Sequence, residues 1–147
     1  MSIPGTTAVQ LAAPGAASFS VTSITDPNGN PSEVLDVDLG FVISGTVTLP
    51  NYLQGPATVC VYADELGGPF DGKIAPCAQL TLNPANPVPD PSGSTTYPWT
   101  VTYLGNSNVL PDPSNGSQLY RLAAVFVYGA PGLDIGSFVE MGLFLIN

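Results

Sequence analysis

Acidic side chains are the most numerous charged groups in this sequence. The 147 residues include 11 Asp and Glu, two Lys and Arg, and no His, which gives a net charge of −9. Without histidine, Ser-His and Cys-His nucleophile pairs cannot form, and two cations, Lys73 and Arg121, are too few to clamp a phosphate group. The sequence therefore predicts a protein that is not an enzyme and that binds no nucleic acid.

Carboxylates are also metal ligands, and hard cations such as Ca²⁺ take them from turns. If each predicted strand reverses the one before it, eight acids gather at one end of the molecule, which we call the acidic pole: Asp26, Glu33, Asp36, Asp38, Asp64, Glu65, Asp71 and Asp112. The tentative metal ligands among them are Asp26, Asp64, Glu65, Asp71 and Asp112. The stretch DPNGNPSEVLDV begins like an EF-hand loop, but Pro31 and Val37 stand where that loop needs Gly and Glu. We therefore expect solvated loops and no cofactor, with a Ca²⁺ site as the alternative.

Cys60 and Cys77 are the only cysteines, and they form no CxxC motif and have no histidine to complete a zinc site. We expect a disulfide between them; the alternative is a pair of buried thiols. A disulfide needs an oxidising compartment, so it predicts an extracellular or surface-associated protein. The first residues, MSIPGTTAVQLAAPG, lack the basic segment of a signal peptide.

Alternation of apolar and polar residues is the main structural signal in the chain. It is clearest over 34–49, VLDVDLGFVISGTVTL, where apolar residues occupy odd positions and a bend is expected near Gly40 or Gly45. Six further runs resemble it: 18–25, 57–63, 74–82, 95–104, 118–128 and 137–146. Pro and Gly interrupt nearly every window in which a helix could start. The repeated sequence PDPS, at 89–92 and 111–114, is typical of turns. Seven strands of this spacing predict a two-sheet antiparallel sandwich.

One of these runs, LYRLAAVFVY, resembles the penultimate strand of immunoglobulin-like and fibronectin-like domains. Its residues Tyr120, Leu122, Ala124 and Phe126 alternate after a long loop. The resemblance implies an all-β, immunoglobulin-like sandwich over residues 18–147, with Trp99 as a candidate core aromatic, and roles in adhesion, recognition or assembly. The cysteines depart from the antibody pattern, because they are 17 residues apart on the third and fourth runs, so a bridge would join neighbouring strands.

Residues 1–17 form an uncharged N-terminal arm with a short extended piece, Val9, Gln10 and Leu11, between Pro4 and Pro14. We expect this arm to dock on a neighbouring copy by adding a strand to a sheet edge; docking on its own sandwich is the alternative. The predicted function is therefore that of a structural, self-assembling subunit of a filament, coat or surface layer. No apolar run is long enough to insert into a membrane.

A different function is open to the same fold. An extracellular adhesion module could bind carbohydrate or protein through aromatic side chains in or near its loops, and it could depend on Ca²⁺. The aromatic candidates for that role are Tyr52, Tyr97, Trp99 and Tyr103.

Overall fold

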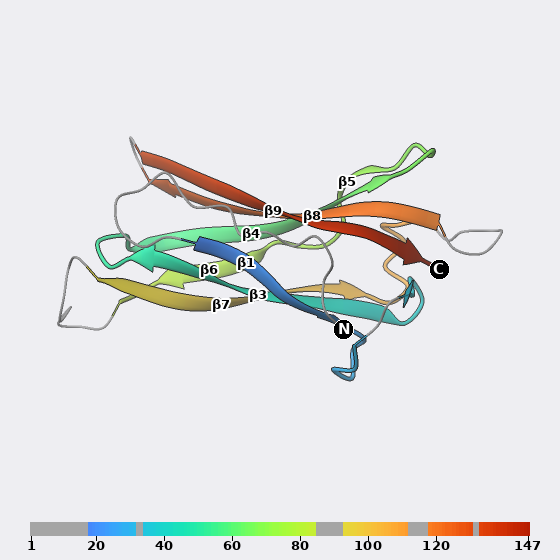
Figure 1. Ribbon diagram of the computed structural model, residues 1–147, viewed down its shortest axis with the longest axis horizontal. Helices are drawn as coiled ribbons and strands as arrows, with labels where there is room; N and C mark the ends of the chain where they lie inside the picture. Colours follow the sequence, from blue (N-terminus) through green and yellow to red (C-terminus); the bar gives the residue numbers. More distant parts are fainter. Residues whose placement is uncertain (1–17, 32–33, 85–92, 112–117, 131–132) are drawn as a thin grey trace.

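Strands account for all the regular structure in the described part of the chain, which comprises residues 18–31, 34–84, 93–111, 118–130 and 133–147 of a computed structural model. Nine strands are found there: β1 (Ser18–Thr25), β2 (Val34–Leu35), β3 (Gly40–Pro50), β4 (Gly55–Glu65), β5 (Asp71–Lys73), β6 (Ala78–Leu82), β7 (Ser94–Leu104), β8 (Gln118–Ala130) and β9 (Leu133–Ile146). They form two layers (Figure 1). The prediction of an all-β, two-sheet sandwich is confirmed, with about nine strands rather than seven. Within these ranges no helix is long and apolar enough to cross a membrane.

The two sheets differ in size. Sheet A has three strands in the order β1-β3-β7, and sheet B has six, in the order β2-β9-β8-β4-β5 with β6 also paired to β4. All neighbours are antiparallel except β2 and β9, which pair in parallel over two residues at the end of β9. Sheet B therefore has a long, continuous centre made of β9, β8 and β4.

The hydrophobic core fills the space between the sheets. Aromatic rings from both sheets meet there: Phe19 lies 5.6 Å from Trp99 and 5.9 Å from Phe126, measured between ring centroids. Gly45 makes this packing feasible, because a Cβ at that position would lie 2.5 Å from the Trp99 ring and 2.1 Å from the carbonyl oxygen of Ser20. The predicted core aromatic, Trp99, is thus buried as expected.

The prediction of one strand over 34–49 is wrong in its first part. β2 belongs to sheet B and β3 to sheet A, and a turn between them carries the chain across the sandwich. The Asp36 carboxylate closes this turn by accepting hydrogen bonds from the backbone N–H groups of Asp38 at 2.8 Å and Leu39 at 3.3 Å. The expected bend near Gly40 is therefore a complete break, and Gly40 has a positive φ of 88°.

The expected strand over 74–82 begins only at residue 78, as β6, and β5 precedes it as a short strand that was not predicted. β5 and β6 pair with different parts of β4, and Ile74–Cys77 connect them without strand pairing. The disulfide between Cys60 and Cys77 is confirmed; it joins β4 to the residue before β6, with the two Cα atoms 4.4 Å apart. It therefore links neighbouring strands of sheet B, as the positions of the cysteines predicted.

The strand directions bring several turns together at one end of the sandwich. Hydrogen bonds there join segments far apart in sequence: Val37 N–H donates to the Asn147 carbonyl, Asn106 N–H to the Val37 carbonyl, and Leu66 N–H to the Leu119 carbonyl, each at 2.9 Å. This end holds the described residues of the acidic pole. The opposite end holds the turn at residues 51–54 between β3 and β4.

Candidate association surface

The outer face of sheet A is made mainly of hydroxyl groups, although Val42, Pro98 and Leu104 also lie at its outward positions. Its outward side chains come from alternate positions of β1, β3 and β7 and include Ser20, Ser44, Thr46, Thr48, Thr96, Thr100 and Thr102. These side chains bond to one another across the strands: Thr48 to Thr96 at 2.8 Å, Ser20 to Thr46 at 3.2 Å, and Ser44 to Thr100 at 3.3 Å, all between side-chain oxygens. This face satisfies its own polar groups and is well suited to water.

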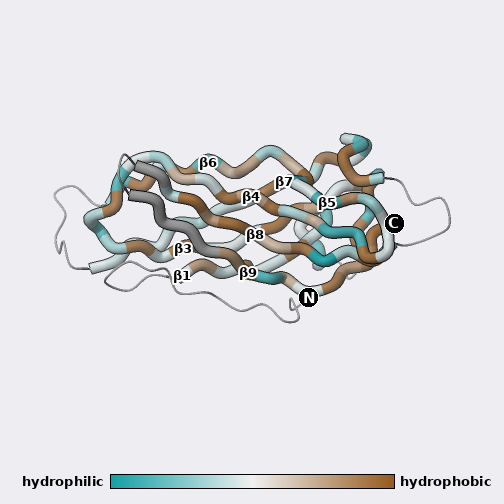
Figure 2. Tube along the Cα trace, turned by 90° about the horizontal axis from the view of Figure 1, so that it is seen from above, coloured by the Kyte–Doolittle hydropathy of each residue, from teal (hydrophilic) through white to brown (hydrophobic). Residues whose placement is uncertain are grey.

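The outer face of sheet B is largely apolar. Its most exposed large side chains include Phe138 on β9, 55% exposed, Val127 on β8, 46% exposed, and Tyr62 on β4, 40% exposed. Backbone register sets Phe138 beside Val125, and Val125 beside Cys60, so the disulfide extends the same apolar row. Figure 2 looks onto this sheet and shows β9, β8 and β4 lying side by side. We call this set of outward residues on β4, β8 and β9 the apolar face.

The composition of β8 explains why the apolar face exists. Its inward residues Tyr120, Leu122, Ala124 and Phe126 are buried in the core. The outward positions between them, apart from Arg121, are Ala123, Val125 and Val127. A strand that is apolar on both sides is normally covered on both sides. In the described structure only its inner side is covered.

Both cations of the chain lie on sheet B, next to the apolar face. Arg121 on β8 is in register with Asp64 on β4, and Lys73 on β5 is in register with Tyr62. The Arg121 guanidinium lies 3.4 Å from the Glu140 carboxylate on β9, and these two side chains are 51% and 58% exposed. An ion pair this exposed contributes little to stability, so both groups are free to take other partners.

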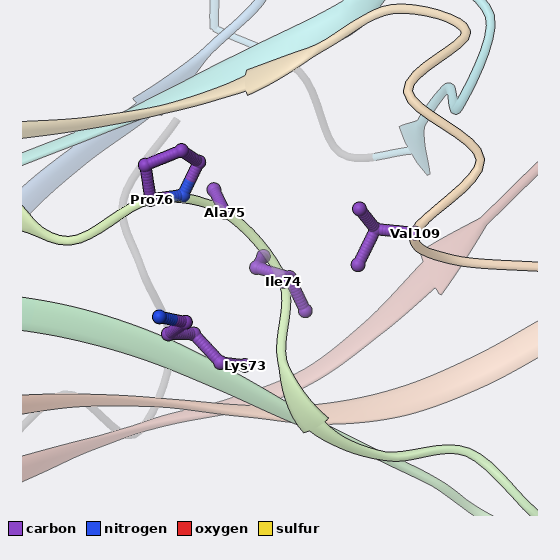
Figure 3. Close-up of a pocket in the computed structure, with 5 residues that line it drawn as sticks. All are labelled: Lys73, Ile74, Ala75, Pro76 and Val109. Carbon is purple, nitrogen blue, oxygen red and sulfur yellow. The ribbon is translucent and has the colours of Figure 1, made fainter.

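A cavity of about 330 Å³ lies beside the connection from β5 to β6. Figure 3 shows Lys73, Ile74, Ala75 and Pro76 lining it from this connection and Val109 from the segment after β7. A binding pocket needs several convergent polar groups to orient a ligand, and this lining offers one charged side chain, that of Lys73. The cavity therefore has the shape of a small site without the chemistry that would select a ligand.

The described acidic residues of the pole do not converge on one point, although Asp64 and Asp71 are neighbours across β4 and β5. Asp26 caps its own turn, accepting from the backbone N–H groups of Asn28 at 2.9 Å and Asn30 at 3.0 Å. The hydrogen bond from Asn30 is the main reason that the pKa of Asp26 lies below its usual value. Glu65 accepts from the Phe70 N–H at 3.3 Å, whereas Asp64 and Asp71 are paired in β4 and β5 rather than lying in a loop.

No three acidic or cysteine side chains come together as a metal site among the residues that the structure describes. Asp112, the fifth tentative ligand, and Glu33 lie outside those residues. The arm residues Val9, Gln10 and Leu11 also lie outside them, so their docking stays a prediction.

The aromatic binding candidates separate into two groups. Trp99 and Tyr103 are 2% exposed, and Tyr103 stacks on Phe41 with centroids 4.8 Å apart, so both belong to the core. Tyr97 is partly buried and packs against the core, whereas Tyr52 is 50% exposed in the turn between β3 and β4. The exposed aromatics Tyr62 and Phe138 were not among the candidates. Apolar residues at both odd and even positions of 118–128 were the signal that marked this sheet.

One buried polar group lies under the apolar face. The Tyr120 hydroxyl on β8 is fully buried and has no hydrogen-bond partner among the described residues. Burial, assisted by the nearby Glu65 carboxylate, raises the pKa of Tyr120 to about 12. This tyrosine therefore stays neutral over the whole physiological range.

Comparisons with known proteins add little to this description. No protein-family model matches the chain, and no curated protein matches it in sequence. Among solved structures, the crystal structure of the C-terminal domain of wzt is similar with a TM-score of 0.49 and 10% sequence identity, covering 98% of this chain and 79% of that one. We therefore infer a function from the surfaces of the chain itself.

Proposed function

We propose that this protein is a non-catalytic structural subunit that self-associates through the apolar face. The observation that carries the proposal is the exposure of Phe138, Val127 and Tyr62 together on the centre of sheet B. Large exposed apolar patches on soluble domains mark interaction sites, because covering them removes apolar surface from water at about 25 cal/mol per Å². A subunit with this face gains free energy by pairing.

The proposal includes an immunoglobulin-like topology for the sandwich. The orders β1-β3-β7 and β9-β8-β4 correspond to the A-B-E and G-F-C orders of that fold. Domains of this architecture present their sheet faces and edges to other proteins, which suits a role in assembly more than one in catalysis.

The proposal assigns no reaction and no cofactor to the chain. Its support is the chemistry of the acidic side chains: Asp26 and Asp36 hold their own turns through hydrogen bonds, and Glu140 pairs with Arg121. A general acid or base must be free to reach a substrate, and a metal needs several ligands at one point.

Filament, coat or surface-layer assembly is the wider role that we propose. The Cys60–Cys77 disulfide suits an oxidising, extracellular setting. Docking of the arm, through Val9, Gln10 and Leu11, would add a second contact between copies. A head-to-tail contact of this kind extends into an open assembly unless its rotation closes a ring.

A second candidate function uses exposed aromatic side chains for a different partner. Tyr62 and Phe138 lie on the apolar face, and Tyr52 is half exposed at the far end from the acidic pole. Such rings stack on sugars or fill pockets of another protein, so an adhesion module is the alternative. In that case the protein alone would stay monomeric.

Sedimentation velocity over a range of concentrations tests the proposal. We expect wild-type protein to form dimers or larger species at roughly 100 μM. The double variant Val127→Thr, Phe138→Ser should associate at least about tenfold more weakly. The matched control is Thr100→Ser on the outer face of sheet A, which should associate like wild type. A monomeric wild-type protein at all concentrations would refute self-association.

A further inference from the structure

The charges beside the apolar face identify what covers it. Resting on the proposed function, we infer that a second copy of this chain packs on the face in a two-fold arrangement, with Lys73 and Arg121 of each copy against acidic side chains of the other. The acids available on the same sheet are Asp64, Asp71 and Glu140. The partner must therefore present an apolar patch with both positive and negative side chains beside it.

Charge balance limits where two copies can meet. The chain has a net charge of −9 with only two cations, and both cations lie on sheet B beside the apolar face. The charged side chains described at outward positions of sheet B are Lys73, Arg121, Asp64, Asp71 and Glu140, a net charge of −1. At the acidic pole two copies would bring acids together without a cation, which costs free energy unless salt screens it. The strands of sheet A carry no charged side chain, but their outer face is mainly hydroxyl groups, which gain less from being covered than apolar side chains do. The apolar face therefore combines a favourable apolar contact with little repulsion between copies.

Symmetry makes the same mixture of charges useful. In a two-fold contact each patch meets itself, so a residue of one copy faces a different residue of the other and the reverse contact is equivalent. Cations on β8 and β5 and acids on β9, β4 and β5 can then pair across the contact. The existing pair, Arg121 with Glu140, is exposed and therefore loses little when its members change partners.

Partners of simpler charge fit the face less well. A strongly acidic partner meets Asp64, Asp71 and Glu140, and a strongly basic partner meets Lys73 and Arg121. An uncharged polysaccharide offers no charged group to any of these five side chains. A second copy brings the complementary charges and a matching apolar patch together, which is the basis of specificity in interfaces of this kind.

A charge-swapped pair of variants tests the inference. The first variant, Lys73→Glu with Arg121→Glu, leaves only acids among the charged groups described at the outward positions of sheet B. The second variant, Asp64→Lys with Asp71→Lys and Glu140→Lys, leaves only bases at those positions. We expect each variant alone to associate at least about tenfold more weakly than wild type, because like charges meet across the contact. An equimolar mixture should form mixed dimers, identified by their mass in native mass spectrometry.

The possible outcomes separate the inference from the proposed function. Mixed dimers with weak homodimers support the inference, whereas variants that pair with themselves as well as wild type does, or a mixture without mixed dimers, overturn it. A wild-type protein that is itself monomeric refutes the proposed function instead, so the two failures differ. If the triple-lysine variant does not give the wild-type circular dichroism spectrum, Glu140→Lys alone replaces it, because Glu140 is 58% exposed and tolerates the change.

Discussion

The outer faces of the two sheets have the same alternating pattern but opposite chemistry. On sheet A the outward positions of β3 and β7 are mainly Ser and Thr, and on sheet B those of β8 and β9 include Val125, Val127, Phe138 and Leu143. Both sheets bury their inner faces in one core. The inner faces therefore specify the fold, whereas the outer faces specify which surfaces the folded protein contacts.

The two outer faces differ in the free energy of their exposure to water. The hydroxyls of sheet A bond to one another at 2.8–3.3 Å and to solvent, so exposing them costs little. The apolar side chains of sheet B gain nothing from water, and covering them with another surface is favourable. The difference predicts that one face stays wet and the other is covered.

Loss of the disulfide should have the largest effect on stability. The bridge lies on sheet B and closes a loop with a sequence separation of 17, so replacing both residues, Cys60→Ala with Cys77→Ala, should lower the free energy of unfolding by about 3 kcal/mol. Urea denaturation at neutral pH measures this change. A urea midpoint equal to that of wild type would show that the disulfide does not stabilise the protein.

Alkaline pH should lower the stability of the protein because of the buried tyrosine Tyr120. The pKa of Tyr120 is raised to about 12 in the folded protein, so the folded state holds a proton that the unfolded state releases near pH 10. The stabilising contribution is complete below pH 10 and falls by about 2 kcal/mol as pH approaches 12.

Two Tyr→Phe variants on sheet B, at Tyr120 and Tyr62, test this explanation. Tyr120→Phe should flatten the decline and leave neutral-pH stability unchanged or improved, because the lost hydroxyl has no described partner. Tyr62→Phe removes an exposed hydroxyl and should keep the decline. An identical pH profile for wild type and Tyr120→Phe would contradict the assignment.

The hydroxyl pairs of sheet A should contribute little individually. Thr48 and Thr96 are joined by a 2.8 Å hydrogen bond on the solvent side, so a double-mutant cycle with Thr48→Val and Thr96→Val should give a coupling energy of about 0.5 kcal/mol. Thermal unfolding of the four proteins measures it. A coupling of several kcal/mol would mean that the hydroxyl face is a structural network and not a wet surface.

Calcium should have the smallest effect. The Asp26 carboxylate already accepts bonds from Asn28 and Asn30, so about 5 mM Ca²⁺ should change the melting temperature by less than about 1 °C. Mg²⁺ at equal concentration controls for ionic strength. A rise of several degrees specific to Ca²⁺ would establish a metal site at the acidic pole.

Alternation in the sequence predicted the strands well, because a period of two follows directly from the geometry of a half-buried strand. Phe41, Ile43, Val47 and Leu49 on β3 are buried as that pattern requires. The disulfide was predictable because the chain offers one pairing. These features depend on local chemistry, which a sequence displays.

The break between β2 and β3 was not predictable from the same pattern. Leu35 and Val37 are indeed buried, so the alternation continues through a turn that the Asp36 carboxylate closes. The apolar face was also missed, because periodicity identifies the side of a strand that faces the core and not what covers the other side. Only the register of β4, β8 and β9 brings Tyr62, Val125 and Phe138 onto one surface.

Self-association through the apolar face is the central claim, and its most direct test is hydrogen exchange of wild-type protein at low and high concentration. Association should slow exchange in β8 and β9 around Val127 and Phe138 at roughly 100 μM relative to roughly 1 μM, and leave β7 around Thr100 unchanged. Equal exchange of β8 and β9 at both concentrations, or slower exchange confined to β7, would contradict the account.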